Sequence, residues 1–395
     1  MPMIEGWKET TLGEVAEIVK DQWLPGDADQ KYIGLEHINQ GDLQINGFGC
    51  SSSLQSNKFY FKQGDILFGK LRPYFRKVWK ARFDGVCSTD IWVLRAKEGY
   101  DQNYLFYFMA NPVFIDKSTG ASIGTKMPRA DWDFLKRSKW LFPPLSEQRA
   151  IAAVLSSFDD KIELLRRQNK TLEAIAQAIF KEWFVKFKVK GEQLKLNPKT
   201  GLPEGWTQKG LDEIADFLNG LALQKYPPEN EEDVLPVVKI RELKSGITDQ
   251  TDKASKRINP EYIVDNGDVL FSWSGSLEVV LWSYGKGALN QHLFKVTSKK
   301  YPKWFYYYWI MEHLPFFKSI AEAKATTMGH IQRHHLAEAK VAIPHNDFMT
   351  FANSKIKPVF EHIVLNNSQI QTLSKLRDTL LPKLMKGEIR VKREE

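Results

Sequence analysis

A short apolar segment, residues 64–68 (GDILF), is followed by a dense run of basic and aromatic side chains. Six Lys or Arg residues and three aromatic residues lie within residues 69–82. Lys and Arg neutralise phosphates, and a guanidinium can donate two hydrogen bonds to guanine in the major groove. We therefore expect DNA contacts from Lys70, Arg72, Tyr74, Arg76 and Lys77. The alternative is a strand with Phe75 and Trp79 in the core and a solvated charged face.

The second half of the chain carries a similar apolar segment with different polar residues after it. Residues 267–271 (GDVLF) lead into a neutral stretch, and residues 289–292 (LNQH) follow. Asn and Gln suit adenine edges, and Ser suits several base edges. The sequence predicts DNA contacts from Trp273, Ser274, Ser276, Asn290, Gln291 and His292. The alternative here is a polar turn with a hydrogen-bonded Asn–Gln pair.

A loop of small residues precedes a polar segment in both halves. Residues 119–126 and residues 325–330 are the two loops. Glycine and other small residues allow close approach to a nucleic-acid backbone or base. These regions add a third set of predicted DNA contacts, namely Ser122, Thr125, Lys126, Arg129, Thr326, Thr327, His330 and Arg333.

The two halves are related by an internal repeat. Gly6-Trp7 recurs as Gly205-Trp206, residues 64–68 recur as residues 267–271, and Pro143 recurs as Pro344. The matches keep their order at an offset of about 200 residues, which is the pattern of a tandem duplication. The exposed loops differ while the apolar residues match, so the repeat predicts two domains with one fold and two different sequence preferences.

Each unit begins with a turn-rich mixed part. Strands are expected at residues 65–68, 91–95, 234–240 and 292–296, where β-branched and aromatic residues cluster between turn-forming residues. Helices are expected near residues 12–19, 102–110 and 304–314. The predicted class is α+β, a mixed α/β fold without regular strand–helix alternation.

A long helix follows the first mixed part, because residues 146–187 contain neither Gly nor Pro. Apolar residues recur at every seventh position, at Ile151, Phe158, Leu165, Leu172 and Ile179. Leu155, Ile162 and Ala176 widen this stripe. A helix of this length, about 63 Å at about 1.5 Å per residue, needs a partner for its single apolar stripe.

The partner is predicted near the end of the same chain. Its stripe comprises Val359, Ile363, Ile370, Leu373 and Leu380, together with Leu376 and Leu384. Asn366 interrupts the stripe, and a polar residue in such a seam often fixes register. Pro358 is expected to start or kink this segment, and Pro382 to disturb its last turns. We expect an antiparallel two-helix coiled coil between the two globular domains.

The predicted organisation has four parts. Residues 1–145 form the first recognition domain and residues 146–190 the central helix. Residues 191–345 comprise a linker and the second recognition domain, and residues 346–395 form the distal helix.

Composition and missing motifs exclude several other classes. Two cysteines rule out a disulfide framework or a four-thiolate zinc site, and no apolar stretch is long enough to cross a membrane. We find no nucleotide-binding glycine loop and no complete metal motif around His330, His334 and His335. We expect a cytoplasmic protein that binds no metal or cofactor. The net charge of +8 lies mostly in the helical segments, so phosphate attraction by this chain should be modest.

The complete pattern resembles the specificity subunit of Type I restriction–modification systems. The resemblance covers essentially the whole chain. It rests on Gly6-Trp7, on the two apolar segments at 64–68 and 267–271, on residues 289–294 (LNQHLF), and on residues 143–148 (PPLSEQ) before the long helix. Residues 380–389 (LLPKLMKGEI) are also typical. Residues 344–348 (PHNDF) depart from the pattern at the start of the second helix.

The resemblance implies a non-catalytic DNA-recognition subunit. Each globular domain would read one half of a bipartite, asymmetric site in double-stranded DNA, and the helices would set the spacer and dock two methyltransferase subunits. Motor-nuclease subunits would join for restriction. S-adenosylmethionine, ATP and Mg²⁺ would be bound by those partners. The rival hypotheses are a self-sufficient DNA methyltransferase or nuclease and a protein-only coiled-coil scaffold.

Overall fold

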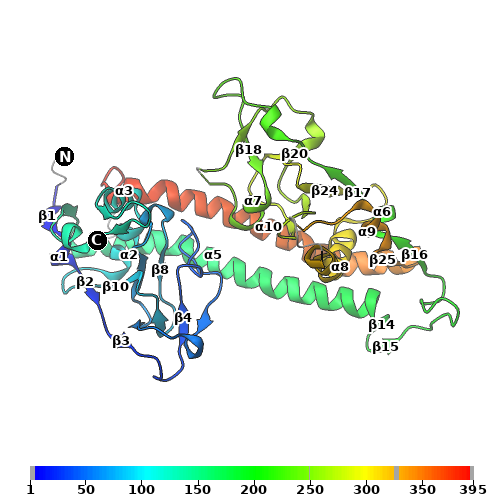
Figure 1. Cartoon of the computed structure of the whole chain (residues 1–395), viewed down its shortest axis with the longest axis horizontal. Helices are drawn as coiled ribbons and strands as arrows, with labels where there is room; N and C mark the ends of the chain where they lie inside the picture. The colour runs from blue at the N-terminus through cyan, green and yellow to red at the C-terminus, as the bar shows by residue number, and fades with distance from the viewer. Residues whose placement is uncertain (1–4, 249, 324–328, 392–395) are drawn as a thin grey trace. The chain divides into compact units, whose positions relative to one another are not determined.

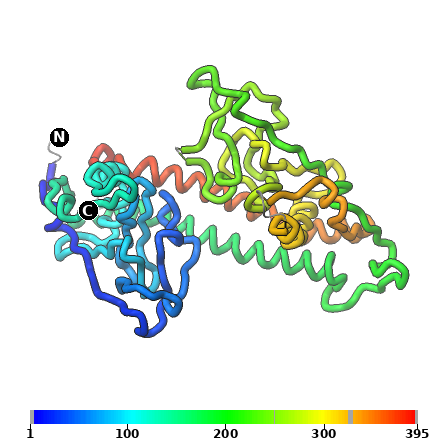
Figure 2. The backbone as a smooth tube through the Cα atoms, in the orientation of Figure 1, coloured from blue at the N-terminus to red at the C-terminus, as the bar shows by residue number. Residues whose placement is uncertain are grey.

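The computed structural model describes residues 5–248, 250–323 and 329–391, and the chain divides into two compact units (Figure 1). Unit 1 combines Met1–Lys161 with Leu373–Glu395, and unit 2 is Ile162–Thr372. The helices α5 (Leu145–Phe180) and α10 (Asn346–Met385) each contribute residues to both units. Figure 2 traces both ends of the described chain into unit 1.

Among the described residues of unit 1, two larger sheets form most of the globular part. The first is antiparallel, in the order β2-β10-β7-β8, with strands β2 (Ala16–Val19), β10 (Ile91–Ala96), β7 (Ile66–Gly69) and β8 (Val78–Lys80). The second has the order β3-β6-β9-β4-β5, with strands β3 (Gln22–Trp23), β6 (Lys58–Phe61), β9 (Gly85–Cys87), β4 (Lys31–Ile33) and β5 (Gly49–Cys50). In this sheet β4 and β9 are parallel, while the other neighbours are antiparallel.

Unit 2 repeats this topology. Its antiparallel sheet has the order β17-β24-β21-β22, with strands β17 (Asp216–Asn219), β24 (Leu293–Thr297), β21 (Val269–Ser272) and β22 (Val279–Leu281). Its second sheet has the order β19-β18-β23-β20, with strands β19 (Lys253–Ala254), β18 (Leu235–Val238), β23 (Gly287–Leu289) and β20 (Ile263–Val264). The β18–β23 pair is parallel, like β4–β9. The predicted internal repeat is therefore confirmed by strand order and direction.

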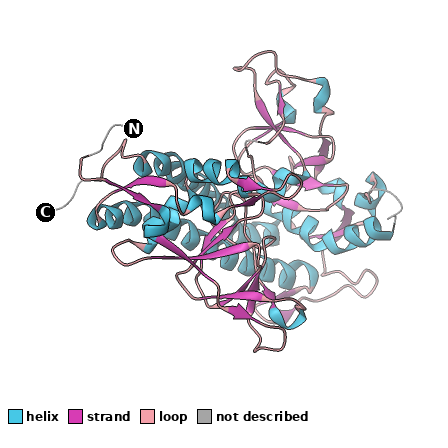
Figure 3. Ribbon diagram, turned by 60° about the vertical axis from the view of Figure 1, so that its left-hand side comes forward, coloured by secondary structure: helices cyan, strands magenta, loops and turns pink. Residues whose placement is uncertain are grey.

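Across the described part of the chain, four short strand pairs complete the sheets. Figure 3 shows the strands in magenta. The pair β1 (Lys8–Thr11) and β13 (Lys139–Phe142) joins the start and end of the first globular part. The pair β16 (Thr207–Gly210) and β25 (Lys340–Ile343) does the same in unit 2. The remaining pairs are the hairpins β11 (Ser122–Ile123)–β12 (Arg129–Ala130) and β14 (Lys188–Val189)–β15 (Glu192–Gln193).

The shorter helices partly follow the sequence expectations. They are α1 (Leu12–Val15), α2 (Gln102–Ala110), α3 (Pro112–Gly120) and α4 (Trp132–Leu135) in unit 1, and α6 (Leu211–Ile214), α7 (Ile240–Ser245), α8 (Lys303–Ala323) and α9 (Arg333–Glu338) in unit 2. The predicted helix over residues 12–19 was wrong in its second half. Residues 16–19 form β2 because they pair with β10, and tertiary pairing outweighs local helix propensity.

The long helices form part of each domain core. In unit 1, Ile151 and Leu155 of α5 and Leu381 and Leu384 of α10 belong to the same buried cluster as Phe68 of β7. In unit 2, Ala176 and Phe180 of α5 pack in one cluster with Ile356 and Phe360 of α10 and with Phe271 of β21. Within each unit, the portions of α5 and α10 therefore bury one face against the globular part and a seam against each other.

This double packing explains which predicted seam residues are deepest. Ile151, Leu165, Ile363 and Ile370 are buried, whereas Phe158, Leu172, Ile179, Val359, Leu373 and Leu380 are partly buried. Leu155, Ile162 and Ala176, on the side expected only to widen the stripe, are almost completely buried. Leu376 remains 47% exposed, and its neighbour Arg377 is buried instead.

Within each unit, α5 and α10 run antiparallel. In unit 1, Asp159 contacts Arg377, and in unit 2, Asn169 contacts Asn366 while Trp183 lies against Phe351. The helix α10 passes through Pro358 and Pro382 without ending. Pro358 is exposed, and the buried neighbours Ile356 and Phe360 hold the helix on both sides of the missing backbone hydrogen bond.

Candidate nucleic-acid interface

Three chain segments of unit 1 meet just beyond the end of β7. The backbone N–H of Lys70 donates to the carbonyl of Asp90 at 2.9 Å, and the N–H of Ala130 donates to the carbonyl of Lys70 at 2.9 Å. The N–H of Arg72 donates to the carbonyl of Pro128 at 2.7 Å. Two regions selected independently from the sequence, residues 70–77 and 122–129, are therefore adjacent.

Unit 2 builds the same arrangement from equivalent segments. The N–H of Trp273 donates to the carbonyl of His292 at 3.3 Å, and the N–H of Ile331 donates to the carbonyl of Trp273 at 2.9 Å. The N–H of Gly275 donates to the carbonyl of Gly329 at 2.8 Å. The isolated antiparallel bridges correspond as well, with Leu71 opposite Arg129 in unit 1 and Ser274 opposite His330 in unit 2. Each unit thus presents one three-segment site on a common backbone.

The side chains of the unit 1 site are mainly cationic. The guanidinium of Arg129 pairs with the carboxylate of Asp90 through two hydrogen bonds, and this pairing raises the pKa of Arg129. Lys70 is half-buried beside them, and desolvation lowers its pKa, with Arg129 and Lys20 adding to the effect against the opposing influence of Asp90. Arg72 donates from Nη2 to the carbonyl of Lys126 at 3.3 Å. The cations are therefore held in place by the domain itself.

The basic loop, residues 70–77, contains a tight turn, and its side chains differ in how far they are exposed. Pro73–Phe75 form a 3-10 helix, and the flanking Arg72 and Arg76 have positive φ values of 51° and 54°. Tyr74 is 42% exposed and lies edge-on to Phe75 at a ring distance of 4.8 Å. The ammonium of Lys77 instead donates to the carbonyl of Leu35, and desolvation lowers its pKa. Tyr74, Phe75 and Arg72 are thus more available for contact with a ligand than Lys77 is.

The β11–β12 hairpin supplies the exposed edge of the unit 1 site. Thr125 and Lys126 are exposed at its tip, next to Ile123, which is 68% exposed. The hydroxyl of Ser122 donates to the carbonyl of Ser118 in α3 at 2.8 Å, so this group already has a partner within unit 1. A hairpin tip with an exposed cation and apolar side chains is suited to entering a DNA groove.

The unit 2 site combines aromatic, hydroxyl and imidazole groups. Trp273 donates from Nε1 to the side-chain oxygen of Asn219 at 2.9 Å, and its ring lies 5.9 Å from that of His292. The hydroxyl of Ser274, which is buried, lies 3.0 Å from Nδ1 of His292. His330 lies edge-on to Trp273 at a ring distance of 6.4 Å. These side chains offer hydrogen bonds and stacking in place of the cations of unit 1.

A cavity of about 480 Å³ adjoins this site in unit 2. Its lining includes Asn290, Gln291 and His292 together with Lys239 and Lys253. Asn290 is only 5% exposed, and its Nδ2 lies 3.5 Å from Oε1 of Gln291, so the polar turn considered as the alternative is present. The same turn also lines the cavity, so contact of these side chains with DNA stays a prediction.

The other predicted residues of unit 2 lie at the margins or outside the described chain. The hydroxyl of Ser276 accepts a hydrogen bond from the ammonium of Lys244 at 2.7 Å. Arg333 is exposed at the start of α9. Thr326 and Thr327 lie outside the described residues.

The sequence interpretation missed one segment of unit 1 completely. Residues 88–90 (STD) hold the position that residues 290–292 (NQH) hold in unit 2. The N–H of Ser88 donates to the carbonyl of Ile33, as the N–H of Asn290 donates to that of Val238. The signal was the repeat itself, because the offset of about 200 residues maps LNQH onto CSTD. Lys239 and Lys253 were also missed, since nothing local marks them.

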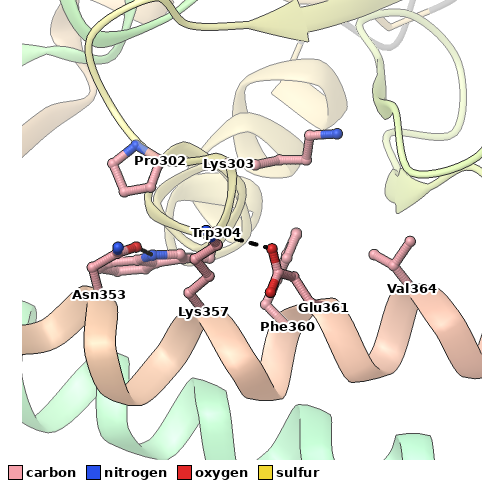
Figure 4. Close-up of a pocket in the computed structure, with 8 residues that line it drawn as sticks. All are labelled: Pro302, Lys303, Trp304, Asn353, Lys357, Phe360, Glu361 and Val364. Atoms are coloured by element: carbon pink, nitrogen blue, oxygen red, sulfur yellow. Dashed lines mark hydrogen bonds and ion pairs between the residues drawn. The ribbon is translucent and has the colours of Figure 1, made fainter.

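A further pocket lies between α8 and α10 in unit 2 (Figure 4). Trp304 donates from Nε1 to the side-chain oxygen of Asn353 at 2.8 Å, and Lys357 pairs with Glu361 at 3.7 Å. Pro302, Lys303, Phe360 and Val364 complete the lining. The lining of this pocket contains none of the predicted DNA contacts.

Across residues 5–248, 250–323 and 329–391, no group of three or more His, Cys, Asp and Glu side chains is placed to hold a metal ion. Among the helices of that same part of the chain, none is both long and apolar enough to cross a membrane.

Comparisons with known proteins identify the family of the chain. The family model described as Type I restriction modification DNA specificity domain matches residues 4–174 and 203–356, one match for each half. The MjaIX specificity subunit of Methanocaldococcus jannaschii is 28% identical over 75% of this chain and 71% of its own length. The HindI specificity subunit of Haemophilus influenzae is 22% identical over 97% of this chain and 99% of its own.

A solved structure gives the same fold. The crystal structure of the Type I restriction–modification S subunit from M. genitalium superposes with a TM-score of 0.55 at 14% identity, covering 97% of this chain and 98% of that one. At this identity the likeness concerns the fold alone. The two family matches, which span more than half of the sequence, decide the assignment. The chain belongs to the family of Type I restriction–modification DNA specificity subunits, the non-catalytic subunits that recognise the DNA sequence for their methyltransferase and restriction partners.

Proposed function

We propose that each three-segment site reads one half of a bipartite, asymmetric DNA sequence. This proposal rests on one observation. The two units have the same backbone arrangement at this site, but they carry different side chains there. Leu71 and Arg129 face each other in unit 1, and Ser274 and His330 face each other at the corresponding position in unit 2. Similar scaffolds are expected to approach the duplex in similar ways, and different side chains to select different bases.

The two sites differ in the chemistry that they offer. The unit 1 site, with Lys70, Arg72 and Arg129, favours acceptor-rich edges such as guanine O6 and N7. The unit 2 site, with Gln291, His292 and Trp273, favours edges that present both a donor and an acceptor, together with stacking or thymine-methyl contacts. The two half-sites are therefore expected to differ in sequence.

The long helices are proposed to fix the spacer between half-sites and to dock two methyltransferase subunits. Exposed apolar residues on α5 and α10, such as Leu164, Ile175, Leu365 and Leu376, offer surface for subunit contacts. S-adenosylmethionine, ATP and Mg²⁺ are proposed to be bound by the methyltransferase and motor-nuclease partners. The complex is proposed to act in the cytoplasm. Insertion of seven residues into both helices should change the preferred spacer, and an unchanged preference would reject this role.

The central experiment compares equivalent variants from the two units. The chain is assembled with its methyltransferase subunits, and duplexes with either half-site altered are titrated. Arg129→Ala should weaken selection at one half-site, and His292→Ala should weaken selection at the other. Loss at the same half-site for both variants would contradict one reader per unit.

The same titrations distinguish the remaining functions. Methylation or cleavage by the purified chain without partners would indicate a self-sufficient enzyme. An absence of specific duplex binding by the complete complex would indicate a protein-only scaffold.

A further inference from the structure

A short segment of unit 1 connects the long helices to the basic loop. The backbone N–H of Gly41 donates to the carbonyl of Arg76 at 3.1 Å, at the end of the 3-10 turn. One residue later, the carbonyl of Asp42 accepts a hydrogen bond from Nη1 of Arg377 at 3.3 Å. Residues 41–43, which we call the strap, therefore contact α10 on one side and the DNA-facing loop on the other.

Arg377 is an unusual residue at its position on α10. Its side chain is 1% exposed, and its Nη1 lies 2.6 Å from Oδ1 of Asp159 on α5. The other oxygen of Asp159 accepts a hydrogen bond from the hydroxyl of Tyr107 on α2 at 2.6 Å. Burying an ion pair stabilises a fold no better than well-packed apolar side chains do. Such a pair instead fixes an orientation, because a guanidinium held by a carboxylate directs its remaining N–H groups at fixed angles.

Backbone strain coincides with this connection. Among the described residues, five other than glycine have positive φ, and three of them are Leu43, Arg72 and Arg76. Leu43 has a φ of 62° and is 6% exposed within the unit 1 core. Left-handed conformations of such residues persist only where the surroundings hold them, and they concentrate at functional sites. The strap is held by the Leu43 side chain in the core and by Arg377 at the Asp42 carbonyl.

We propose that Arg377 is a positioning residue for DNA reading by unit 1. Anchored by Asp159, it fixes the Asp42 carbonyl, and the strap then fixes Arg76 and the turn that presents Arg72 and Tyr74. Arg377 itself is buried and touches no base. This inference rests on the proposed reading of one half-site by unit 1.

The test uses three variants in the complex with the methyltransferase subunits. Arg377→Met removes the donor to the strap, Arg377→Lys keeps a cation beside Asp159, and Leu43→Gly relaxes the strap while leaving the ion pair intact. Thr379→Ala, an exposed change on the same helix, is the matched control. Circular dichroism and the unfolding midpoint establish which complexes are folded under the binding conditions.

The readout is discrimination between the correct half-site and single-base variants, measured separately for each half. Folded Arg377→Met and Leu43→Gly complexes should lose about five- to tenfold of the discrimination at the half-site that Arg129→Ala affects, as expected for the loss of one or two positioning hydrogen bonds. Arg377→Lys should recover part of it, and the other half-site should be unchanged. If Arg377→Met does not fold, Leu43→Gly and Arg377→Lys carry the test.

A merely structural role predicts a different result. Lower unfolding midpoints with unchanged discrimination, or equal losses at both half-sites, would overturn the assignment of Arg377. Failure of the underlying proposal is separable, because in that case Arg129→Ala would also fail to act on a single half-site.

Discussion

Arg129 and Asp90 form a two-point ion pair, with Nε 2.8 Å from Oδ1 and Nη2 3.2 Å from Oδ2. The two residues come from different segments of the unit 1 site and occupy the positions that His330 and His292 hold in unit 2. An acidic residue inside a cationic site directs the guanidinium and limits which base edges it can address. Under the proposed function, this pair would link the backbone shared by the two units to the sequence preference of unit 1.

Asp90→Asn should change the sequence preference of the first half-site more than the overall affinity. The substitution keeps the shape and removes the charge that orients Arg129, so the guanidinium is released toward the DNA. Base pairs read through such contacts are discriminated by about 1–3 kcal/mol. Selection from a library randomised in both half-sites is the measurement. An unchanged consensus at both half-sites would show that Arg129 does not address a base.

Lys126→Ala should weaken binding to all duplexes to a similar extent. Lys126 is exposed at the tip of the β11–β12 hairpin, where phosphate contact is the simplest role. Loss of one phosphate contact should reduce the slope of log affinity against log salt by about 1. Titrations of the complex at several salt concentrations test this, with Lys299→Ala as the control. A loss confined to one base position would instead identify Lys126 as a base contact.

The hydrogen bond between Asn169 and Asn366 should stabilise unit 2, and the effects of replacing the two residues should not be additive. Asn366 is 2% exposed, and its Nδ2 donates to Oδ1 of Asn169 at 2.8 Å. Asn366→Leu leaves Oδ1 of the partly buried Asn169 without this donor and should lower the free energy of unfolding by about 1 kcal/mol. Asn169→Leu/Asn366→Leu should cost less than the sum of the single changes. Denaturant unfolding measures the cycle, and Gln369→Ala, exposed on α10, is the control. Strict additivity would mean that the two amides act independently.

Unit 2 should lose stability through Glu173 as the pH rises. Burial raises the pKa of the Glu173 carboxyl, against the lowering effect of hydrogen bonds from Gln177 and Tyr307. A carboxyl with a raised pKa binds more protons in the folded state, so the free energy of unfolding falls as the pH rises above the unfolded pKa of about 4.3. Glu173→Gln should flatten this dependence. Unfolding measured at a series of pH values compares the two proteins, and identical pH slopes would contradict the assignment.

Several features of the fold could be predicted from the sequence because they depend on local pattern or on repetition. The tandem repeat, the two long helices, the seam position of Asn366 and the contrast between the basic loop and residues 289–292 were all visible in the order and spacing of residues. Helix periodicity and internal similarity are properties of the chain itself, so no tertiary information is needed to find them.

The positions of particular side chains were decided only by tertiary structure. Residues 16–19 form a strand because they pair with β10. Arg377 is buried in place of Leu376 because its guanidinium bonds to Asp159 and to the strap. The convergence of residues 70–72, 88–90 and 128–130 depends on hydrogen bonds between segments distant in sequence. Spacing along a chain fixes which face a residue occupies, whereas its partners across the fold are set by packing of elements that no local pattern specifies.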